Sequence, residues 1–166
     1  MMGMFSNLFT RGEPVLSEAA SRDAASIAAL HAASFRRGWS EQEVEGLLTD
    51  RHVIAHRAMV GSAKTGSNLA GFIISRLVED EAEILSVAVA GQRRGRGLAR
   101  NLLNLHLRRL AALGARAVFL EVDEHNAAAI RLYDRAGFHE ISRRPNYYPG
   151  PGGQAVAALV LRRDLV

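Results

Sequence analysis

The feature that most constrains this chain is an apolar strand that leads through a glycine-containing turn into a long helix. The strand is predicted over Glu83–Val89 and the helix over Leu98–Leu113, and the turn between them has glycine at positions 95 and 97. A helix that begins this way leaves its first amide groups without intrahelical partners, at the positive end of the helix dipole. Glycine lets the backbone approach a ligand closely because it has no Cβ. The pattern predicts a binding site for an anion such as a pyrophosphate.

The turn by itself has two interpretations. Arg94, Arg96 and Arg100 add positive charge that suits phosphate groups, but a lone Gly-x-Gly is more often a tight turn with a solvated basic face. Two other phosphate motifs are excluded. The chain has no Gly-Lys-Ser/Thr sequence and so no nucleotide-triphosphate loop, and Arg100 stands where a dinucleotide fingerprint needs glycine or alanine.

A second strand, predicted over Arg116–Val122, carries one carboxylate among apolar residues. Alternation along the strand places Glu121 on the face opposite Leu120 and within the sheet. An unpaired buried carboxylate is costly, so a strand this apolar seldom carries one without a role. Glu121 is therefore a candidate catalytic residue, and the alternative is a glutamate at the rim that pairs with one of the many arginines.

The last predicted helix, Asn126–Ala136, contributes an amide and a phenol. Asn126 and Tyr133 are seven residues apart, about two helical turns, so they point to the same side. Asn126 also suits the N-cap, as Gly137 suits the C-terminal end of this helix. Tyr133 is a candidate site residue on this spacing, and a half-buried aromatic ring that packs on the sheet is an equal alternative.

The order of the elements predicts an α/β fold with one parallel β-α-β crossing at the centre of a mixed, mostly antiparallel sheet flanked by helices. We expect a flexible N-terminal extension over residues 1–12 and a single domain over residues 13–166. Ser21 and Ser40 are predicted N-caps of two early helices, with Glu43 completing a capping box. The remaining predicted segments are strands at Val15–Leu16, His52–Val60 and Leu69–Val78, a hairpin loop at Gly61–Asn68, and a closing hairpin of Phe138–Ser142 and Ala155–Leu161 around the loop Pro145–Gly153.

Composition narrows the classes of function. The net charge of +4 favours anionic partners, but all basic residues except Lys64 are arginine, and a solvated basic surface explains this charge better than nucleic-acid binding.

The absence of cysteine excludes disulfides, a thiolate zinc site and a cysteine nucleophile. His125 has no second ligand at metal-binding spacing, so we expect no metal site. With no signal peptide in Met1–Thr10 and no apolar run of about 20 residues, we expect a cytoplasmic protein that does not contact membranes.

Taken together, the motifs resemble the GCN5-related N-acetyltransferases. The turn Arg94-Gly95-Arg96-Gly97-Leu98-Ala99 fits the Q/R-x-x-G-x-G/A signature of that superfamily, and so do the pieces around Glu121, Asn126, Tyr133 and Phe138. The segment Asn146-Tyr147-Tyr148-Pro149 is similar to one branch, the ribosomal-protein-alanine N-acetyltransferases. The resemblance covers the chain from Glu13 to its C-terminus.

This resemblance implies acetyl-CoA as cosubstrate, no metal, and a splayed parallel strand pair that admits the cofactor. It implies that Glu121 is the catalytic base and Tyr133 the acid for the departing thiolate, while Asn126 contacts the cofactor arm. The pantetheine would pair with the backbone of Val87, Ala88 and Val89. The residues that would grip the pyrophosphate are Arg94, Gly95, Arg96, Gly97, Leu98, Ala99 and Arg100.

The resemblance also implies an acceptor, the N-terminal alanine of a small-subunit ribosomal protein. A groove for the end of a polypeptide could be lined by Trp39, Tyr147 and Tyr148, although each of these side chains also suits ordinary packing. The alternatives are another protein N-terminus, a lysine or a small amine, or a non-catalytic acyl-CoA sensor, which would need neither Glu121 nor Tyr133. We expect a monomer or weak dimer without direct nucleic-acid binding.

Overall fold

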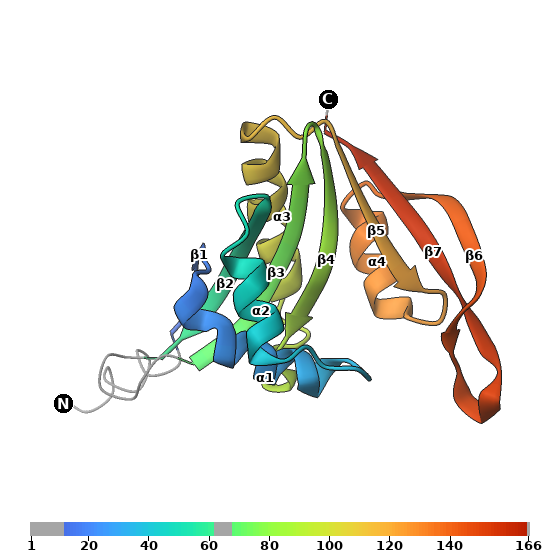
Figure 1. The fold of residues 1–166 in the computed structure, drawn as a ribbon, viewed down its shortest axis with the longest axis horizontal. Coiled ribbons are helices and arrows are strands. Elements are labelled where there is room, and N and C mark those ends of the chain that lie inside the picture. Colours follow the sequence, from blue (N-terminus) through green and yellow to red (C-terminus); the bar gives the residue numbers. More distant parts are fainter. Residues whose placement is uncertain (1–11, 62–67, 166) are drawn as a thin grey trace, which may run out of the picture. The chain divides into compact units, whose positions relative to one another are not determined.

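In the computed structural model, which describes residues 12–61 and 68–165, the chain forms seven strands and four α-helices (Figure 1). The strands are β1 (Val15–Glu18), β2 (Val53–Val60), β3 (Asn68–Val78), β4 (Glu81–Val89), β5 (Ala117–Asp123), β6 (His139–Pro149) and β7 (Ala155–Asp164). The helices are α1 (Ala24–Ser34), α2 (Glu41–Leu48), α3 (Leu98–Ala112) and α4 (Ala127–Arg135), with short 3-10 turns at Ser21–Asp23, Gly91–Arg93 and Pro151–Gly153. The alternation of strands and helices confirms the predicted α/β class.

The strands form one mixed sheet in the order β1-β2-β3-β4-β5-β7-β6. Strands β4 and β5 are parallel, whereas β1–β2, β5–β7 and β6–β7 are antiparallel. The parallel register covers three residue pairs, from Glu81↔Ala117 to Glu83↔Phe119. It therefore ends before Glu121, although β5 continues to Asp123 and pairs with β7 along its whole length.

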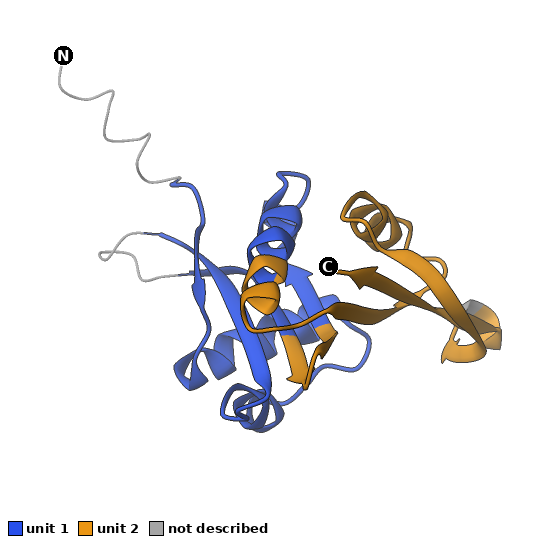
Figure 2. Ribbon diagram, turned by 90° about the horizontal axis from the view of Figure 1, so that it is seen from above, with its two compact units in different colours: residues 1–74, 86–106 blue, residues 75–85, 107–166 orange. Residues whose placement is uncertain are grey.

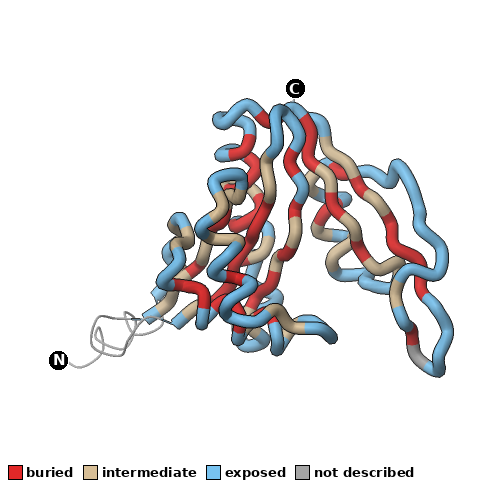
Figure 3. The backbone as a smooth tube through the Cα atoms, viewed as in Figure 1, coloured by how far each residue is buried: buried red, intermediate tan, exposed pale blue. Residues whose placement is uncertain are grey.

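Two compact units divide the chain (Figure 2). The first unit is Met1–Ile74 with Ser86–His106, and the second is Ser75–Leu85 with Leu107–Val166. Elements β3, β4 and α3 thus contribute residues to both units. Buried residues follow β3 and one face of β5, where Val118, Leu120 and Val122 alternate with less buried neighbours (Figure 3).

Local sequence signals explain several element boundaries. Ser40 caps α2 by accepting from the Glu43 amide at 3.1 Å, while the Glu43 carboxylate accepts from the Ser40 amide at 2.7 Å, as predicted. The leucine stripe of α3 is buried at Leu98, Leu102, Leu103, Leu107 and Leu110. The predicted helix end at Gly114 is also confirmed, since this glycine has a φ of 97°.

Two predicted boundaries are wrong. Ser21 begins a 3-10 turn rather than capping α1, because the Asp23 carboxylate accepts from the Ala20 amide at 2.8 Å and closes a tighter turn first. The predicted loop from Pro145 is partly strand, because β6 resumes its pairing with β7 at Tyr148↔Val156 after a register shift. Sequence alternation does not reveal such a bulge.

Two predicted segments lie almost entirely outside the residues that the structure describes. The extension over residues 1–12 lies outside the described residues except for its last residue, and so does most of the hairpin loop Gly61–Asn68. None of the helices in the described part of the chain has the length and apolar character that a membrane span requires.

Two buried histidines meet inside the first unit. Nδ1 of His56 on β2 lies 2.7 Å from Nδ1 of His106 on α3, so one nitrogen donates and the other accepts. Both residues are buried, and burial, followed by the charge of His56, lowers the pKa of His106 to about 3. The pair is therefore stable only while His106 is neutral.

We predict that acid destabilises the fold through His106. Its folded pKa lies below the value of about 6.5 expected when unfolded, so the unfolded chain takes up the proton first and stability falls between pH 6.5 and 3. The loss is on the order of 4 to 5 kcal/mol over that window, at about 1.4 kcal/mol per pH unit. Urea unfolding of His106→Leu should show a shallower pH dependence than the parent. The control His139→Gln, at an exposed position on β6, should keep the parental slope, and equal slopes in parent and His106→Leu would contradict this account.

Candidate functional site

The predicted phosphate turn lies in the first unit, between the end of β4 and the start of α3. Gly95 and Gly97 have φ values of 75° and 77°, a region that other residues rarely adopt. A Cβ built on either glycine meets nothing within 4 Å, so the space above the turn is open. Within the described residues, no hydrogen bond is recorded for the six amides from Gly95 to Arg100, and the next amide, that of Asn101, bonds to the Gly97 carbonyl at 3.0 Å.

These amides fit the diphosphate that the resemblance implies. Six neighbouring unpaired N–H groups lie at the positive end of a 15-residue helix, and donors in this arrangement are of the kind that binds anions. Leu98 is buried and anchors the helix start, while Ala99 is half-buried. Arg96 and Arg100 are exposed, so their charges can reach an anion at the turn.

Arg94 contributes differently from the other two arginines of the turn. Its Nε donates to the Val89 carbonyl at 3.2 Å, which fastens the turn to the end of β4. On that strand Ala88 and Val89 are buried and Val87 is half-buried. The neighbouring Ser86 has a buried hydroxyl with no hydrogen-bond partner among the described residues, a feature that sequence reasoning missed.

In the second unit, Glu121 lies on β5 opposite Val160 of β7. Its side chain is 24% exposed, and its recorded partner is Arg144 of β6, whose guanidinium nitrogen is 3.1 Å from the carboxylate. The carboxylate is thus within the sheet, as predicted, but is neither fully buried nor unpaired. Glu121 therefore pairs with an arginine, which is the alternative that the sequence left open for it.

Arg144 joins Glu121 to the two predicted substrate tyrosines. Its guanidinium carbon lies 5.5 Å from the centre of the Tyr147 ring, and the Tyr147 and Tyr148 rings meet edge to face at 5.0 Å. Burial, and next the negative charge of Glu121, raise the pKa of Tyr148. The structure therefore brings Glu121, Tyr147 and Tyr148 together in one cluster with Arg144, an arginine that no local sequence motif singles out.

Asn126 and Tyr133 also belong to the second unit. The Asn126 side chain accepts from the Ala129 amide at 3.2 Å and caps α4, which confirms the predicted N-cap. Tyr133 is 7% exposed and packs edge to face on Phe138, with ring centres 5.5 Å apart. Within the described part of the chain its hydroxyl has no recorded hydrogen bond. Burial raises the pKa of Tyr133 to about 12, so the phenol remains protonated at any physiological pH.

Trp39, the third predicted substrate residue, lies in the first unit between α1 and α2. Its amide donates to Nδ1 of His31 at 3.0 Å, and its ring stacks on the His31 ring at 4.1 Å. Gly38 lies so close to α1 that a Cβ there would be 2.8 Å from Ala32. The segment before α2 is therefore held firmly on α1, and His31, which sequence reasoning missed, is the residue that holds it.

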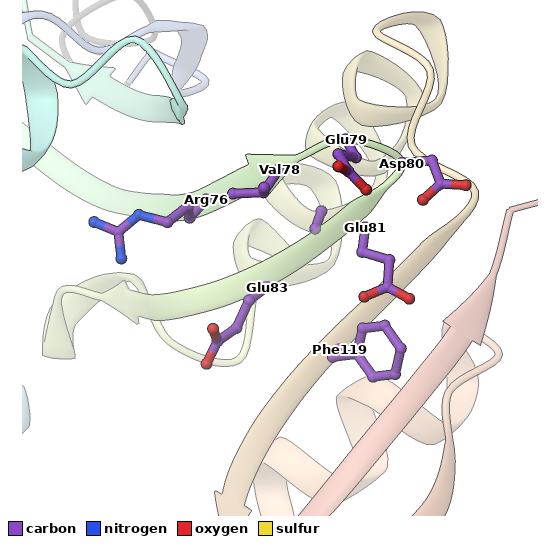
Figure 4. Close-up of a pocket in the computed structure, with 8 residues that line it drawn as sticks. Arg76, Val78, Glu79, Asp80, Glu81, Glu83 and Phe119 are labelled. Carbon is purple, nitrogen blue, oxygen red and sulfur yellow. The ribbon is translucent and has the colours of Figure 1, made fainter.

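A hollow of about 460 Å³ lies in the second unit at the turn between β3 and β4 (Figure 4). Its lining includes Arg76, the carboxylates of Glu79 to Glu83 and the ring of Phe119, and none of the predicted site residues. The described residues contain no group of three or more His, Asp or Glu side chains that could hold a metal ion.

Comparisons with known proteins agree with the motifs. Residues 24–138 match the Acetyltransferase (GNAT) family. The [ribosomal protein bS18]-alanine N-acetyltransferase of Salmonella typhimurium is 34% identical over 74% of this chain and 78% of its own length. The enzyme of that name from Haemophilus ducreyi is 36% identical over 57% of this chain, which spans 65% of that relative. The crystal structure of the ribosomal-protein-S18-alanine N-acetyltransferase from Escherichia coli superposes with a TM-score of 0.81 at 27% identity, covering 92% of this chain and 94% of the other.

We predict that the emission of Trp39, the single tryptophan, reports the charge of His31. Burial lowers the pKa of His31, an effect that Glu43 partly opposes, so the ring is neutral at pH 7 and accepts from the Trp39 amide. Protonation below pH 6.5 removes that acceptor and places a cation against the indole. Fluorescence titration should therefore show a transition with a midpoint below 6.5. The transition should disappear in His31→Leu and persist in His52→Gln, and a titration unchanged by His31→Leu would contradict the assignment.

Proposed function

The chain belongs to the GNAT family of acetyltransferases, and on this premise we propose that it transfers the acetyl group of acetyl-CoA to the N-terminal α-amine of a protein. The acceptor we propose is the N-terminal alanine of a small-subunit ribosomal protein, which the names of the Salmonella and Haemophilus relatives support. Residues 13–166 form the catalytic domain, and a ribosomal acceptor implies a cytoplasmic reaction. The observation that carries the proposal is the run of unpaired amides from Gly95 to Arg100.

In this proposal the turn holds the cofactor by its diphosphate. The amides of Gly95 to Arg100 donate to the phosphate oxygens, and Arg96 and Arg100 balance their charge. Arg94 stays on the Val89 carbonyl and keeps the turn in shape. Bound acetyl-CoA supplies a thioester, whose carbonyl carbon is the electrophile. The backbone of Val87 to Val89 and the Asn126 side chain would contact the pantetheine arm.

Glu121 acts as the base in the proposed reaction. An α-amine has a pKa near 7.7 to 8.0, so roughly a tenth of it is free base at pH 7, and a carboxylate of modest basicity is sufficient. The amine nitrogen forms a bond to the thioester carbon, its proton passes to Glu121 directly or through water, and the carbon–sulfur bond breaks. The chain has no cysteine to carry an acyl intermediate, and direct transfer within one complex of enzyme, acetyl-CoA and acceptor is the mechanism we propose.

Tyr133 stabilises the departing sulfur by hydrogen bonding. With a pKa of about 12, complete proton transfer to a thiolate whose pKa is near 8.5 would cost on the order of 5 kcal/mol. A hydrogen bond that strengthens as charge develops on sulfur avoids that cost. The Tyr133 hydroxyl suits this role, since it has no recorded partner in the described residues. Trp39, Tyr147 and Tyr148 are the proposed acceptor contacts.

The first test is release of free thiol from acetyl-CoA in the presence of peptides beginning with Ala, Ser or Met, with polyamines and lysine as other acceptors. We expect turnover with the Ala peptide, modified at its α-amine by mass spectrometry. Glu121→Gln should lower kcat at least tenfold at pH 7, because the amine loses its base. Transfer only to small amines would contradict the proposed acceptor, and normal turnover by Glu121→Gln would remove Glu121 from the mechanism.

We further predict that Tyr133→Phe lowers kcat about tenfold or more while leaving the affinity for acetyl-CoA nearly unchanged. Because the raised pKa keeps the phenol protonated, the parent enzyme should not lose activity through Tyr133 between pH 8 and 10.5. Initial rates across that range, at saturating acetyl-CoA, measure both effects. A basic limb below pH 10 that is present in the parent and absent in Tyr133→Phe would show that the phenol ionises there, contrary to this account.

A further inference from the structure

One face of the strands β5, β7 and β6 in the second unit carries the cluster around Glu121. Glu121 pairs across the sheet with Val160, and Arg144 pairs with Ala158. Residues opposite one another on neighbouring strands share a face, so Glu121 and Arg144 lie on the same face with Ala158 and Val160 of β7 between them. Because these two side chains are short, the arginine can extend over β7 and reach the carboxylate.

A second acid on this face does not take the arginine. Asp123 is directly opposite Ala158, in the same row as Arg144, and is therefore nearer in register than Glu121. Its carboxylate accepts from the His125 amide at 2.8 Å, in the turn that leads to α4. Arg144 instead makes a diagonal contact with Glu121 at 3.1 Å. Among the described residues, Glu121 has no other recorded ion pair or side-chain hydrogen bond.

The backbone next to Arg144 is shaped for this contact. The register of β6 against β7 shifts between Arg144 and Tyr148, and Asn146 inside the shift has a φ of 57°, which is uncommon for a residue with a side chain. Bulges of this kind redirect side chains and are frequent beside active sites. The guanidinium itself is open to solvent, since the Arg144 side chain is 56% exposed and its other recorded contact is the face of the Tyr147 ring.

The preceding residue provides a comparison within the same strand. Arg143 pairs with Leu159 in register and therefore points to the opposite face of β6. There it contacts Glu124 at 2.9 Å and Glu140 at 3.2 Å. Arg143 and Arg144 thus have the same charge, similar exposure and adjacent positions, and they differ in the carboxylates that they pair with.

We propose that Arg144 occupies the place of the acceptor's ammonium group in the free protein, and that the acceptor binds by displacing the guanidinium from Glu121. The proposal rests on the proposed function, in which Glu121 receives the acceptor amine. A protonated α-amine and a guanidinium compete for one carboxylate, because both are cations that donate hydrogen bonds to its oxygens. The displaced guanidinium can remain on the Tyr147 ring, where cation–π attraction is available.

This exchange makes Arg144 a residue that sets acceptor affinity. An exposed or half-exposed ion pair is weak enough to be broken by a substrate, yet it raises the acceptor concentration needed for half-saturation. A neutral surface over Glu121 would bind any amine more readily. Arg144 thereby favours acceptors whose other contacts with the protein compensate for loss of the Arg144–Glu121 ion pair.

The test compares steady-state kinetics of Arg144→Gln, Arg144→Lys and the matched control Arg143→Gln at saturating acetyl-CoA with a peptide that begins with Ala. For Arg144→Gln we expect the KM of the peptide to fall about two- to fivefold, the range for a partly exposed ion pair, with kcat changed less than twofold. Arg144→Lys restores a cation and should return KM toward the parental value. Arg143→Gln should keep the parental KM.

Guanidinium chloride at low millimolar concentration supplies the missing group and gives a second readout. Guanidinium should inhibit Arg144→Gln, in competition with the peptide, more strongly than it inhibits the parent. Sodium chloride at equal ionic strength is the control. A KM that is unchanged or higher in Arg144→Gln, or a loss of kcat alone, would overturn the proposal and leave the acetyltransferase activity standing. Absence of transfer by the parent protein to every amine would overturn the proposed function and this inference together.

Discussion

A turn that needs two residues with positive φ is the constraint on which the proposed chemistry of this protein depends. Gly95 and Gly97 provide that backbone, and the chain changes there from β4 to α3 without using the amides of Gly95 to Arg100 for its own structure. A side chain at either position would fit the open space but not the dihedral angle. The turn is consequently maintained by backbone conformation and by the Arg94 contact with the Val89 carbonyl, and its donors stay available to an anion.

In the second unit, alternation along β5 places polar and apolar side chains on opposite faces of the sheet. Glu121 lies on the more open face, where it pairs with Arg144 and its charge raises the pKa of Tyr148, whereas Leu120 and Val122 lie on the buried face. Tyr133 on α4 is buried, and its pKa of about 12 keeps it a hydrogen-bond donor. A carboxylate paired with a solvent-exposed arginine and a phenol that stays protonated suit the proposed roles of base and donor in acyl transfer from a thioester to an amine.

Sequence reasoning predicted the local features and missed the long-range contacts. The α/β order, the capping box at Ser40, the leucine stripe of α3, the cap at Asn126 and the glycines of the turn each depend on a few neighbouring residues, and all are confirmed. The pairing of Glu121 with Arg144 depends on the registers of three strands and on a bulge, neither of which is encoded in a short pattern. The same holds for the His31 contact with Trp39 and for the buried His56–His106 pair, where nothing in the local sequence indicates the partner.

The most direct measurement of the central claim is the response of individual backbone amides to coenzyme A, by ¹⁵N–¹H NMR of the labelled protein. Hydrogen bonding to a diphosphate should move the amide resonances of Gly95 to Arg100 more than those of any other contiguous segment. Adenosine without phosphates should leave these six resonances in place. Resonances of this turn that do not move on saturation with coenzyme A would contradict the account, because the unpaired amides would then have no anion to bind.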